Sequence, residues 1–249
     1  MISQSLIQIP SRLLGRSVPC RLVQPDTARN RWCLLLHGYG GNQDSWLRDT
    51  DAAALAEQNR LNLVIPSCGD GYYENTREPL LDFLGQELPE YLAREYDFSR
   101  NREDISVAGV SMGGFGALLL AGSYPEVYGS CASFGGAFIL PDVVDWNQRV
   151  LGNASYLYFC EVFGDFDTLL GSHRDPEAMA RKALAENRLG PVWLVCGEED
   201  PLITANRELA DTLRAAGGAV RFTSLPGSHS WACWKPALKE VFRWLGENS

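Results

Sequence analysis

The segment DISVAGVSMGGFGALLLAGSYPE at residues 104–126 decides the fold, because it begins with a strand pattern and ends with a helix pattern. The apolar run at 105–110 predicts a strand, and 112–123 predicts a helix. One hydroxyl side chain, Ser111, lies at the junction, and glycines flank it at positions 109, 113, 114 and 116. Glycine within a strand or helix costs up to ~1 kcal/mol relative to alanine, so this turn requires small residues for a structural reason.

The rest of the chain extends this strand-to-helix pattern. Short apolar runs predict strands at 5–9, 18–23, 32–37, 61–66, 105–110, 130–134, 191–196 and 220–225. Helical patterns occur at 51–59, 79–95, 112–123, 176–187, 204–216 and 236–246. From residue 32 onward the two kinds alternate, which implies parallel strands joined by right-handed crossovers, whereas the first two strands are expected to form an antiparallel edge. We therefore predict an α/β fold, with a mostly parallel eight-stranded sheet and helices on both faces.

The length and composition indicate one globular domain spanning residues 1–249. Hydrophobic residues make up 45% of the chain and charged residues 21%, and no repeat or linker divides it. The stretch 141–175 has no clear period and is rich in aromatic residues: Trp146, Tyr156, Tyr158, Phe159, Phe163 and Phe166. We expect this stretch to be a small cap insertion over one end of the sheet. The alternative is a satellite core that packs on the sheet edge.

The net charge of −9 argues against a nucleic-acid partner, because such binding depends on neutralising phosphates. No segment reaches the roughly 18 apolar residues of a membrane span, and the first residues lack the pattern of a signal peptide. The seven cysteines are odd in number and scattered, which favours buried thiols in a reduced compartment. These features predict a cytoplasmic protein with no membrane partner, and they leave open whether it forms a homo-oligomer.

Ser111 lies in GVSMG at 109–113, which matches the G-x-S-x-G nucleophile elbow. The turn follows a predicted strand at the sheet edge where ligands bind in open parallel sheets. In an elbow the serine backbone is strained, and side chains two residues to either side would collide with neighbouring elements. The alternative is a serine that caps a helix beside glycines that only allow close packing.

A serine nucleophile needs a base, and the chain offers His37, His173 and His229. In this fold class the order along the chain is Ser, acid, His, which excludes His37. His173 lies in the irregular stretch, and no strand-end acid falls between it and Ser111. His229 lies in SLPGSHSWACW, directly after the last predicted strand, and is the preferred base.

The acid is expected between the serine and the histidine, at the end of a strand. Asp200 in VWLVCGEEDPLI follows the predicted strand at 191–196 after a glycine turn, with Glu198 and Glu199 as neighbouring competitors. Two of these three acidic residues are expected to be solvated. Asp200 is the preferred acid.

An oxyanion hole is expected from LLLHGYGGNQDSW at 34–46. This glycine-rich loop follows the predicted strand at 32–37 beside the elbow, so the backbone N–H groups of Tyr39 and Met112 would point at a developing oxyanion. The alternative is a glycine-rich turn without a chemical role. No set of His, Asp and Cys has metal-ligand spacing, and GYGGN lacks the Lys-Ser/Thr of a phosphate-binding loop, so no metal or cofactor is predicted.

With these motifs assembled, the chain resembles the α/β-hydrolase fold, and more narrowly the esterase D group of serine esterases. That group includes S-formylglutathione hydrolases, tributyrin-type acetylesterases and some feruloyl esterases. The resemblance covers residues 17–245, and the SMGGFGAL core with the PGSHSWACW ending is its most specific part. The resemblance implies a Ser111, Asp200 and His229 triad, oxyanion N–H groups from Tyr39 and Met112, and a substrate pocket lined by Tyr73 and Trp231.

The expected function is that of a serine carboxylesterase acting on small-molecule esters with acetyl to butyryl groups, through an acyl-enzyme on Ser111. The alternatives are an S-formylglutathione hydrolase or a feruloyl or acetyl-carbohydrate esterase. An acyltransferase and a non-catalytic binding protein are less favoured, because no export signal is present and no triad member is missing. The aromatic residues of 141–175, together with Tyr73, are expected to leave a shallow acyl pocket.

Overall fold

The computed structural model describes residues 1–28, 30–147 and 154–247. Within these residues, eight strands form one sheet in the order β1-β2-β4-β3-β5-β6-β7-β8. The strands are β1 (Ile2–Ser11), β2 (Arg16–Pro25), β3 (Trp32–Leu36), β4 (Asn62–Pro66), β5 (Ile105–Val110), β6 (Ser130–Phe134), β7 (Val192–Gly197) and β8 (Val220–Leu225). The predicted α/β fold and its strands are confirmed.

The strands that pair in parallel in the middle of the sheet are also the fully buried ones. From β4 to β8 all neighbours are parallel, and every residue of β3, β4, β5, β6 and β7 is buried. Strands buried on both faces are continuously apolar, as these sequences are. The predicted antiparallel edge is also present, since β1 pairs with β2 and β2 pairs with β4 in antiparallel register.

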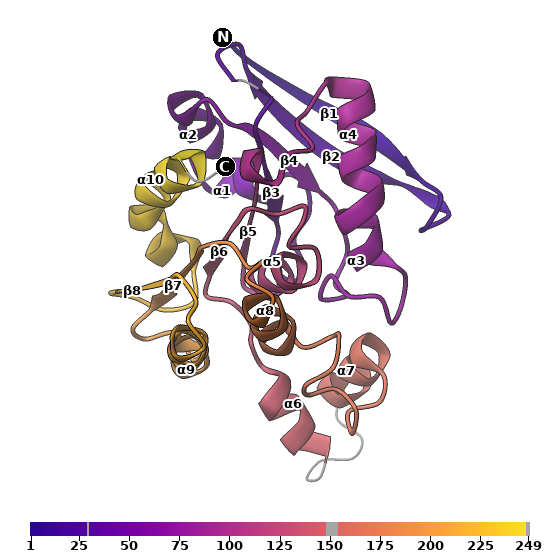
Figure 1. The fold of residues 1–249 in the computed structure, drawn as a ribbon, viewed down its shortest axis with the longest axis vertical. Coiled ribbons are helices and arrows are strands. Elements are labelled where there is room, and N and C mark those ends of the chain that lie inside the picture. The colour runs from indigo at the N-terminus through magenta and orange to yellow at the C-terminus, as the bar shows by residue number, and fades with distance from the viewer. Residues whose placement is uncertain (29, 148–153, 248–249) are drawn as a thin grey trace.

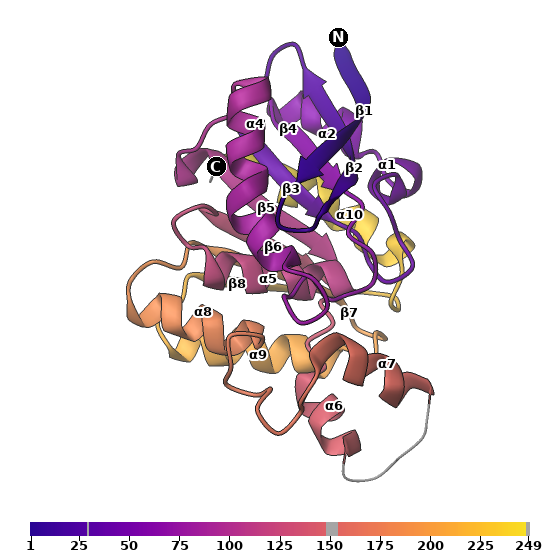
Figure 2. The ribbon, with the colours of Figure 1, turned by 90° about the vertical axis from the view of Figure 1, so that its right-hand side faces the viewer.

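Helices cover both faces of the sheet (Figures 1 and 2). One face carries α1 (Ser45–Asp49), α2 (Ala52–Asn59) and α10 (Trp231–Glu247) over one apolar cluster. The other carries α4 (Leu88–Tyr96), α5 (Met112–Ser123), α8 (Pro176–Ala185) and α9 (Ile203–Ala215) over a second cluster. The segment α3 (Leu80–Asp82) and the π-helical turn η1 (Phe83–Glu87) run directly into α4, and a 3-10 turn η2 (Arg102–Asp104) precedes β5. The result is a three-layer arrangement.

The C-terminal helix differs from its predicted range. It begins at Trp231 rather than at residue 236, with Pro236 inside it. The N–H groups of Cys233 and Trp234 both donate to the Ser230 carbonyl oxygen, so the first turn closes ahead of the proline. The helix therefore begins two residues after His229, which leaves only a short connection from β8.

More than half of the described residues of 141–175 are helical, which their sequence did not predict. It includes most of α6 (Leu140–Asn147) and all of α7 (Ala154–Phe163), which lie together at one end of the molecule in both views (Figures 1 and 2). Phe163 and Phe166 are buried, and Phe163 packs against Tyr72 and Phe115 of the main core. The side chains of Trp146 and Tyr156 lie outside the described residues. Part of this segment is thus an extension of the core.

All seven cysteines are free, and six of them are buried. Among the described helices, none combines the length and apolarity needed to cross a bilayer. In the same part of the chain, no group of three or more His, Cys, Asp or Glu residues is arranged to hold a metal ion.

Candidate active site

Ser111 occupies a sharp turn between β5 and α5, with φ 55° and ψ −118°. Positive φ is uncommon for residues other than glycine, and such strain occurs most often at functional sites. The flanking glycines make the turn possible. A Cβ at Gly109 would lie 2.0 Å from the Gly113 carbonyl oxygen, and a Cβ at Gly113 would lie 2.4 Å from the Leu36 carbonyl oxygen. Side chains at these two positions would therefore collide with neighbouring elements, as the sequence analysis expected.

His229 lies between Ser111 and Asp200. Its Nε2 is 2.9 Å from Ser111 Oγ, and its Nδ1 is 2.7 Å from Asp200 Oδ2. Because a carboxylate only accepts, Nδ1 carries the proton and Nε2 is left to accept from the serine hydroxyl. The ring of Trp234 packs edge-on against the imidazole at 5.0 Å, and 30% of the His229 side chain remains exposed. The histidine is held in one orientation and still faces the surface.

Asp200 lies in the turn after β7, with its side chain fully buried. Its Oδ1 accepts a hydrogen bond from the Leu202 N–H at 2.9 Å, so each carboxylate oxygen has a partner. The competitors Glu198 and Glu199 are exposed, and Glu198 accepts from the Ser224 hydroxyl. The structure thus brings Asp200, and neither glutamate, to the histidine.

The loop predicted to form an oxyanion hole lies beside Ser111 because β3 and β5 are neighbours, with Leu36 opposite Gly109. A Cβ at Gly38 would lie 3.4 Å from Ser111 Cβ. The loop contains a four-residue turn, closed by the Gly41 N–H donating to the Gly38 carbonyl oxygen at 3.0 Å. Among the described residues, neither the Tyr39 N–H nor the Met112 N–H has a hydrogen-bond partner. Both donors are available beside the serine.

The other two histidines take no part in the hydrogen-bonded series of Ser111, His229 and Asp200. His37 is fully buried, its Nδ1–H donates to the Gly38 carbonyl oxygen, and its Nε2 accepts from the Cys68 N–H. Burial lowers the pKa of His37, which keeps the ring neutral. It braces the loop that follows β3. His173 is exposed.

A cleft of about 380 Å³ opens over Ser111. It is lined by Gly38, Tyr39, Gly40, Gly41, Ser45, Arg48, Val110, Ser111, His229, Ser230, Trp231 and Trp234. Trp231 was expected from the sequence to line a substrate pocket, and it borders this cleft. Its ring packs edge-on against Trp46 at 5.0 Å and against Trp234 at 5.7 Å, so the aromatic wall is rigidly supported.

The expectation that Tyr73 lines the pocket is wrong. Its side chain is fully buried, and its hydroxyl donates to the His37 carbonyl oxygen at 2.7 Å. A Cβ at Gly116 would lie 2.5 Å from the tyrosine ring, so the ring packs directly on α5. Tyr73 therefore supports the loop after β3 from inside the core, and its side chain is not exposed to a ligand.

Two further residues lie beside the site: Asp70, which was not identified from the sequence, and Tyr158, which was expected only as one of the aromatic residues of the cap. Asp70 Oδ1 accepts a hydrogen bond from the Gly40 N–H at 2.7 Å. Tyr158 of α7 packs edge-on against Tyr39 at 5.4 Å. Asp70 follows a predicted strand, 61–66, so the strand-end rule could have found it. The contact between Tyr158 and Tyr39 could not be predicted, because it depends on how the insertion folds.

The strand order, the strained serine turn and the adjacent loops are those of an α/β-hydrolase. The family described as "Putative esterase" matches residues 34–245 of the chain. An acetyl esterase of Caldicellulosiruptor saccharolyticus is 29% identical over 232 residues, which cover 90% of this chain and 86% of that protein. The chain therefore belongs to this esterase family of hydrolases.

Solved structures show the same fold. The fluorophosphonate-binding serine hydrolase F of Staphylococcus aureus aligns with a TM-score of 0.87 at 21% identity, covering 98% of both chains. An S-formylglutathione hydrolase of Staphylococcus aureus aligns with a TM-score of 0.85 at 21% identity, covering 99% of both chains. At this identity the similarity concerns the fold.

Proposed function

We propose that this protein is a serine carboxylesterase that hydrolyses short acyl esters through an acyl-enzyme on Ser111. The observation that carries the proposal is the hydrogen-bonded series from Ser111 Oγ through His229 to the buried Asp200 carboxylate. Membership of the esterase family and the likeness to an acetyl esterase support the choice of substrate class.

In the acylation step, Ser111 Oγ attacks the carbonyl carbon of the ester while its proton passes to His229 Nε2. The carbonyl electron pair moves onto the oxygen, and the N–H groups of Tyr39 and Met112 stabilise that oxyanion. When the carbonyl re-forms, the bond to the alcohol oxygen breaks. The departing alcohol takes the proton from His229, and the acyl group stays on Ser111.

In the deacylation step, water attacks the acyl carbon and gives its proton to His229 Nε2. Collapse of this second tetrahedral intermediate breaks the bond to Ser111 Oγ, which recovers the proton from His229. The products are one carboxylic acid and the free serine. Asp200 keeps the proton of His229 on Nδ1 and stabilises the imidazolium that forms in each step.

The proposal also covers the size of the acyl group, the role of the segment 141–175 and the cellular compartment. The acetyl to butyryl size is proposed from the likeness to an acetyl esterase, and the cleft of about 380 Å³ has room for such a group together with its alcohol. The segment 141–175 would act as a small cap on a single domain spanning 1–249, since Tyr158 reaches Tyr39 at the cleft. Free and mostly buried cysteines favour a reducing compartment such as the cytoplasm.

The test is hydrolysis of p-nitrophenyl esters from two to twelve carbons by wild type and Ser111→Ala. We expect kcat/KM to peak at two to four carbons, because overpacking outweighs the ~0.8 kcal/mol that each further methylene could contribute. Ser111→Ala should lose the activity, and a fluorophosphonate probe should label wild type at Ser111. An active Ser111→Ala protein, or labelling at another serine, would contradict the proposed nucleophile, and an optimum at eight carbons or longer would contradict the acyl size.

A further inference from the structure

The turn at 38–41 is open to its surroundings at its second and third positions. Gly40, at its third position, has φ +69°, and a Cβ built there would have nothing within 4 Å. Tyr39, at the second position, is 65% exposed. Because glycine tolerates both signs of φ, the backbone at Gly40 can change conformation and so shift the turn. A contact from outside the turn is therefore needed to fix the position of its backbone, which includes the Tyr39 N–H of the proposed oxyanion hole.

The loop that follows β4 provides that support. The Cys68 N–H donates to His37 Nε2 at 3.1 Å, and the Tyr73 hydroxyl donates to the His37 carbonyl oxygen at 2.7 Å. These two contacts brace the residue before the turn. The third contact reaches the turn itself, because Asp70 Oδ1 accepts from the Gly40 N–H at 2.7 Å.

Asp70 is in turn held by the insertion. The Tyr158 hydroxyl donates to the Asp70 carbonyl oxygen at 2.6 Å, and the same ring packs edge-on against Tyr39. Tyr158 therefore contacts both Tyr39 and the residue that binds Gly40. The turn, the loop after β4 and α7 form one connected group.

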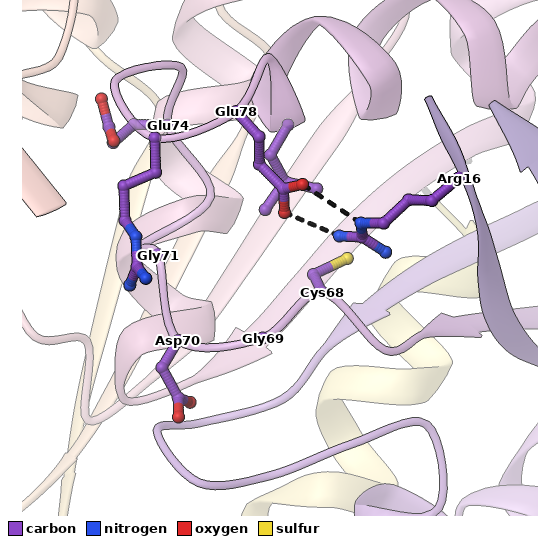
Figure 3. Close-up of a pocket in the computed structure, with 9 residues that line it drawn as sticks. Arg16, Cys68, Gly69, Asp70, Gly71, Glu74 and Glu78 are labelled. Carbon is purple, nitrogen blue, oxygen red and sulfur yellow. Dashed lines mark hydrogen bonds and ion pairs between the residues drawn. The ribbon is translucent and has the colours of Figure 1, made fainter. Parts of the chain in front are cut away.

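The direction of the Asp70 side chain agrees with its hydrogen bond to Gly40. Asp70 borders a cleft of about 330 Å³ that also contains the Arg16 and Glu78 ion pair, whose shortest distance is 2.6 Å. Figure 3 shows the Asp70 carboxylate pointing away from that pair, with no dashed line joining it to the charged residues drawn. The Asp70 carboxylate thus binds the turn at 38–41 and does not pair with Arg16.

From these contacts we infer that Asp70 is a positioning residue for the oxyanion hole. It fixes the backbone of the 38–41 turn through the Gly40 N–H. This limits movement of the preceding residue, whose N–H is proposed to stabilise the tetrahedral intermediates. The inference rests on the proposed function. What the turn requires is a hydrogen-bond acceptor, and a negative charge close to an oxyanion is unfavourable. An asparagine at position 70 should therefore serve as well as the aspartate.

The experiment compares Asp70→Ala, Asp70→Asn and Glu78→Gln with wild type on p-nitrophenyl acetate. Rates are normalised to the active sites titrated with a fluorophosphonate. Asp70→Ala should lower kcat by about 10- to 100-fold with little change in KM, somewhat less than the ~10²–10³-fold loss for removing an oxyanion donor outright. Asp70→Asn should keep the wild-type kcat. Glu78→Gln disrupts an ion pair in the same cleft and should leave kcat unchanged.

A second readout separates positioning from a general loss of structure. The inhibition constant of a trifluoromethyl ketone, which forms a tetrahedral adduct on the serine, should rise in Asp70→Ala by the same factor as kcat/KM falls. Unchanged kcat in Asp70→Ala, or an equal loss in Asp70→Asn, would overturn the inference. A wild-type protein that is not labelled at Ser111 would overturn the proposed function, and this inference with it.

Discussion

At the scale of single residues, burial decides which groups in this site can act. Three acidic residues stand together at 198–200, and only Asp200 is buried against the imidazole. A buried carboxylate with both oxygens hydrogen-bonded can hold His229 in one orientation, whereas an exposed glutamate exchanges its partners with water. The strained backbone of Ser111 also depends on its surroundings. The packed structure around the serine has to stabilise a conformation that the residue alone rarely adopts.

The matched variants Asp200→Asn and Glu199→Gln test this argument. Asp200→Asn should lower kcat on p-nitrophenyl acetate on the order of 10⁴-fold, because an amide beside Nδ1 favours the wrong tautomer of the imidazole. Glu199→Gln changes the adjacent exposed residue and should leave kcat within about twofold of wild type. If Glu199→Gln is the crippling change, the acid has been wrongly assigned.

At the scale of elements, the site is built from the segments that follow parallel strands. The loop after β3, the elbow after β5, the turn after β7 and the connection after β8 supply the turn at 38–41, Ser111, Asp200 and His229. The carboxyl ends of parallel strands lie at one edge of a sheet, so residues far apart in the chain meet there. The elbow is the tightest of these connections, because α5 returns directly over β5 and β3.

The variant Gly113→Ala tests how tightly the elbow is packed. Its Cβ would lie 2.4 Å from the Leu36 carbonyl oxygen, a backbone atom that cannot move aside without displacing β3. We expect a loss of ~1–3 kcal/mol in the free energy of unfolding, measured by urea denaturation. The control is Gly71→Ala, because a Cβ there has nothing within 4 Å and its φ is not positive. Equal stability of the two variants would contradict the close approach of α5 to β3.

At the scale of the whole molecule, the two apolar clusters share one sheet, and the insertion adds to one of them. Phe163 of α7 packs on Tyr72 and Phe115, which belong to the cluster under α5. Such a molecule is expected to unfold as a unit, because neither face keeps its core without the sheet. The buried acidic residue Glu74 links this global stability to pH.

The unfolding of Glu74→Gln and wild type between pH 4 and pH 8 tests both points. Burial raises the pKa of the Glu74 carboxyl, although hydrogen bonds from Thr76 oppose the shift. The folded protein therefore binds this proton more tightly than the unfolded chain does. The resulting stabilisation is fully present below the ordinary pKa of about 4.3 and is lost as pH rises through the raised value.

Because glutamine cannot ionise, the melting temperature of Glu74→Gln relative to wild type should rise between pH 4 and pH 8. Both proteins should show one transition, with coincident near- and far-ultraviolet circular dichroism. A difference that stays constant with pH would show that Glu74 is not desolvated. Two separate transitions would contradict the single domain.

The sequence alone determined the sheet, the order of its strands along the chain and the three residues now found hydrogen-bonded to one another. Apolar runs and the G-x-S-x-G spacing are local properties, and parallel strands bring their ends to one edge whatever the connecting segments do. Only the tertiary structure decided the surroundings of those residues. Tyr73 is buried under the His37 loop, Asp70 binds Gly40, and Tyr158 reaches Tyr39. These contacts join segments whose separation is set by loops and an insertion without periodic pattern, so their partners depend on how the whole chain packs.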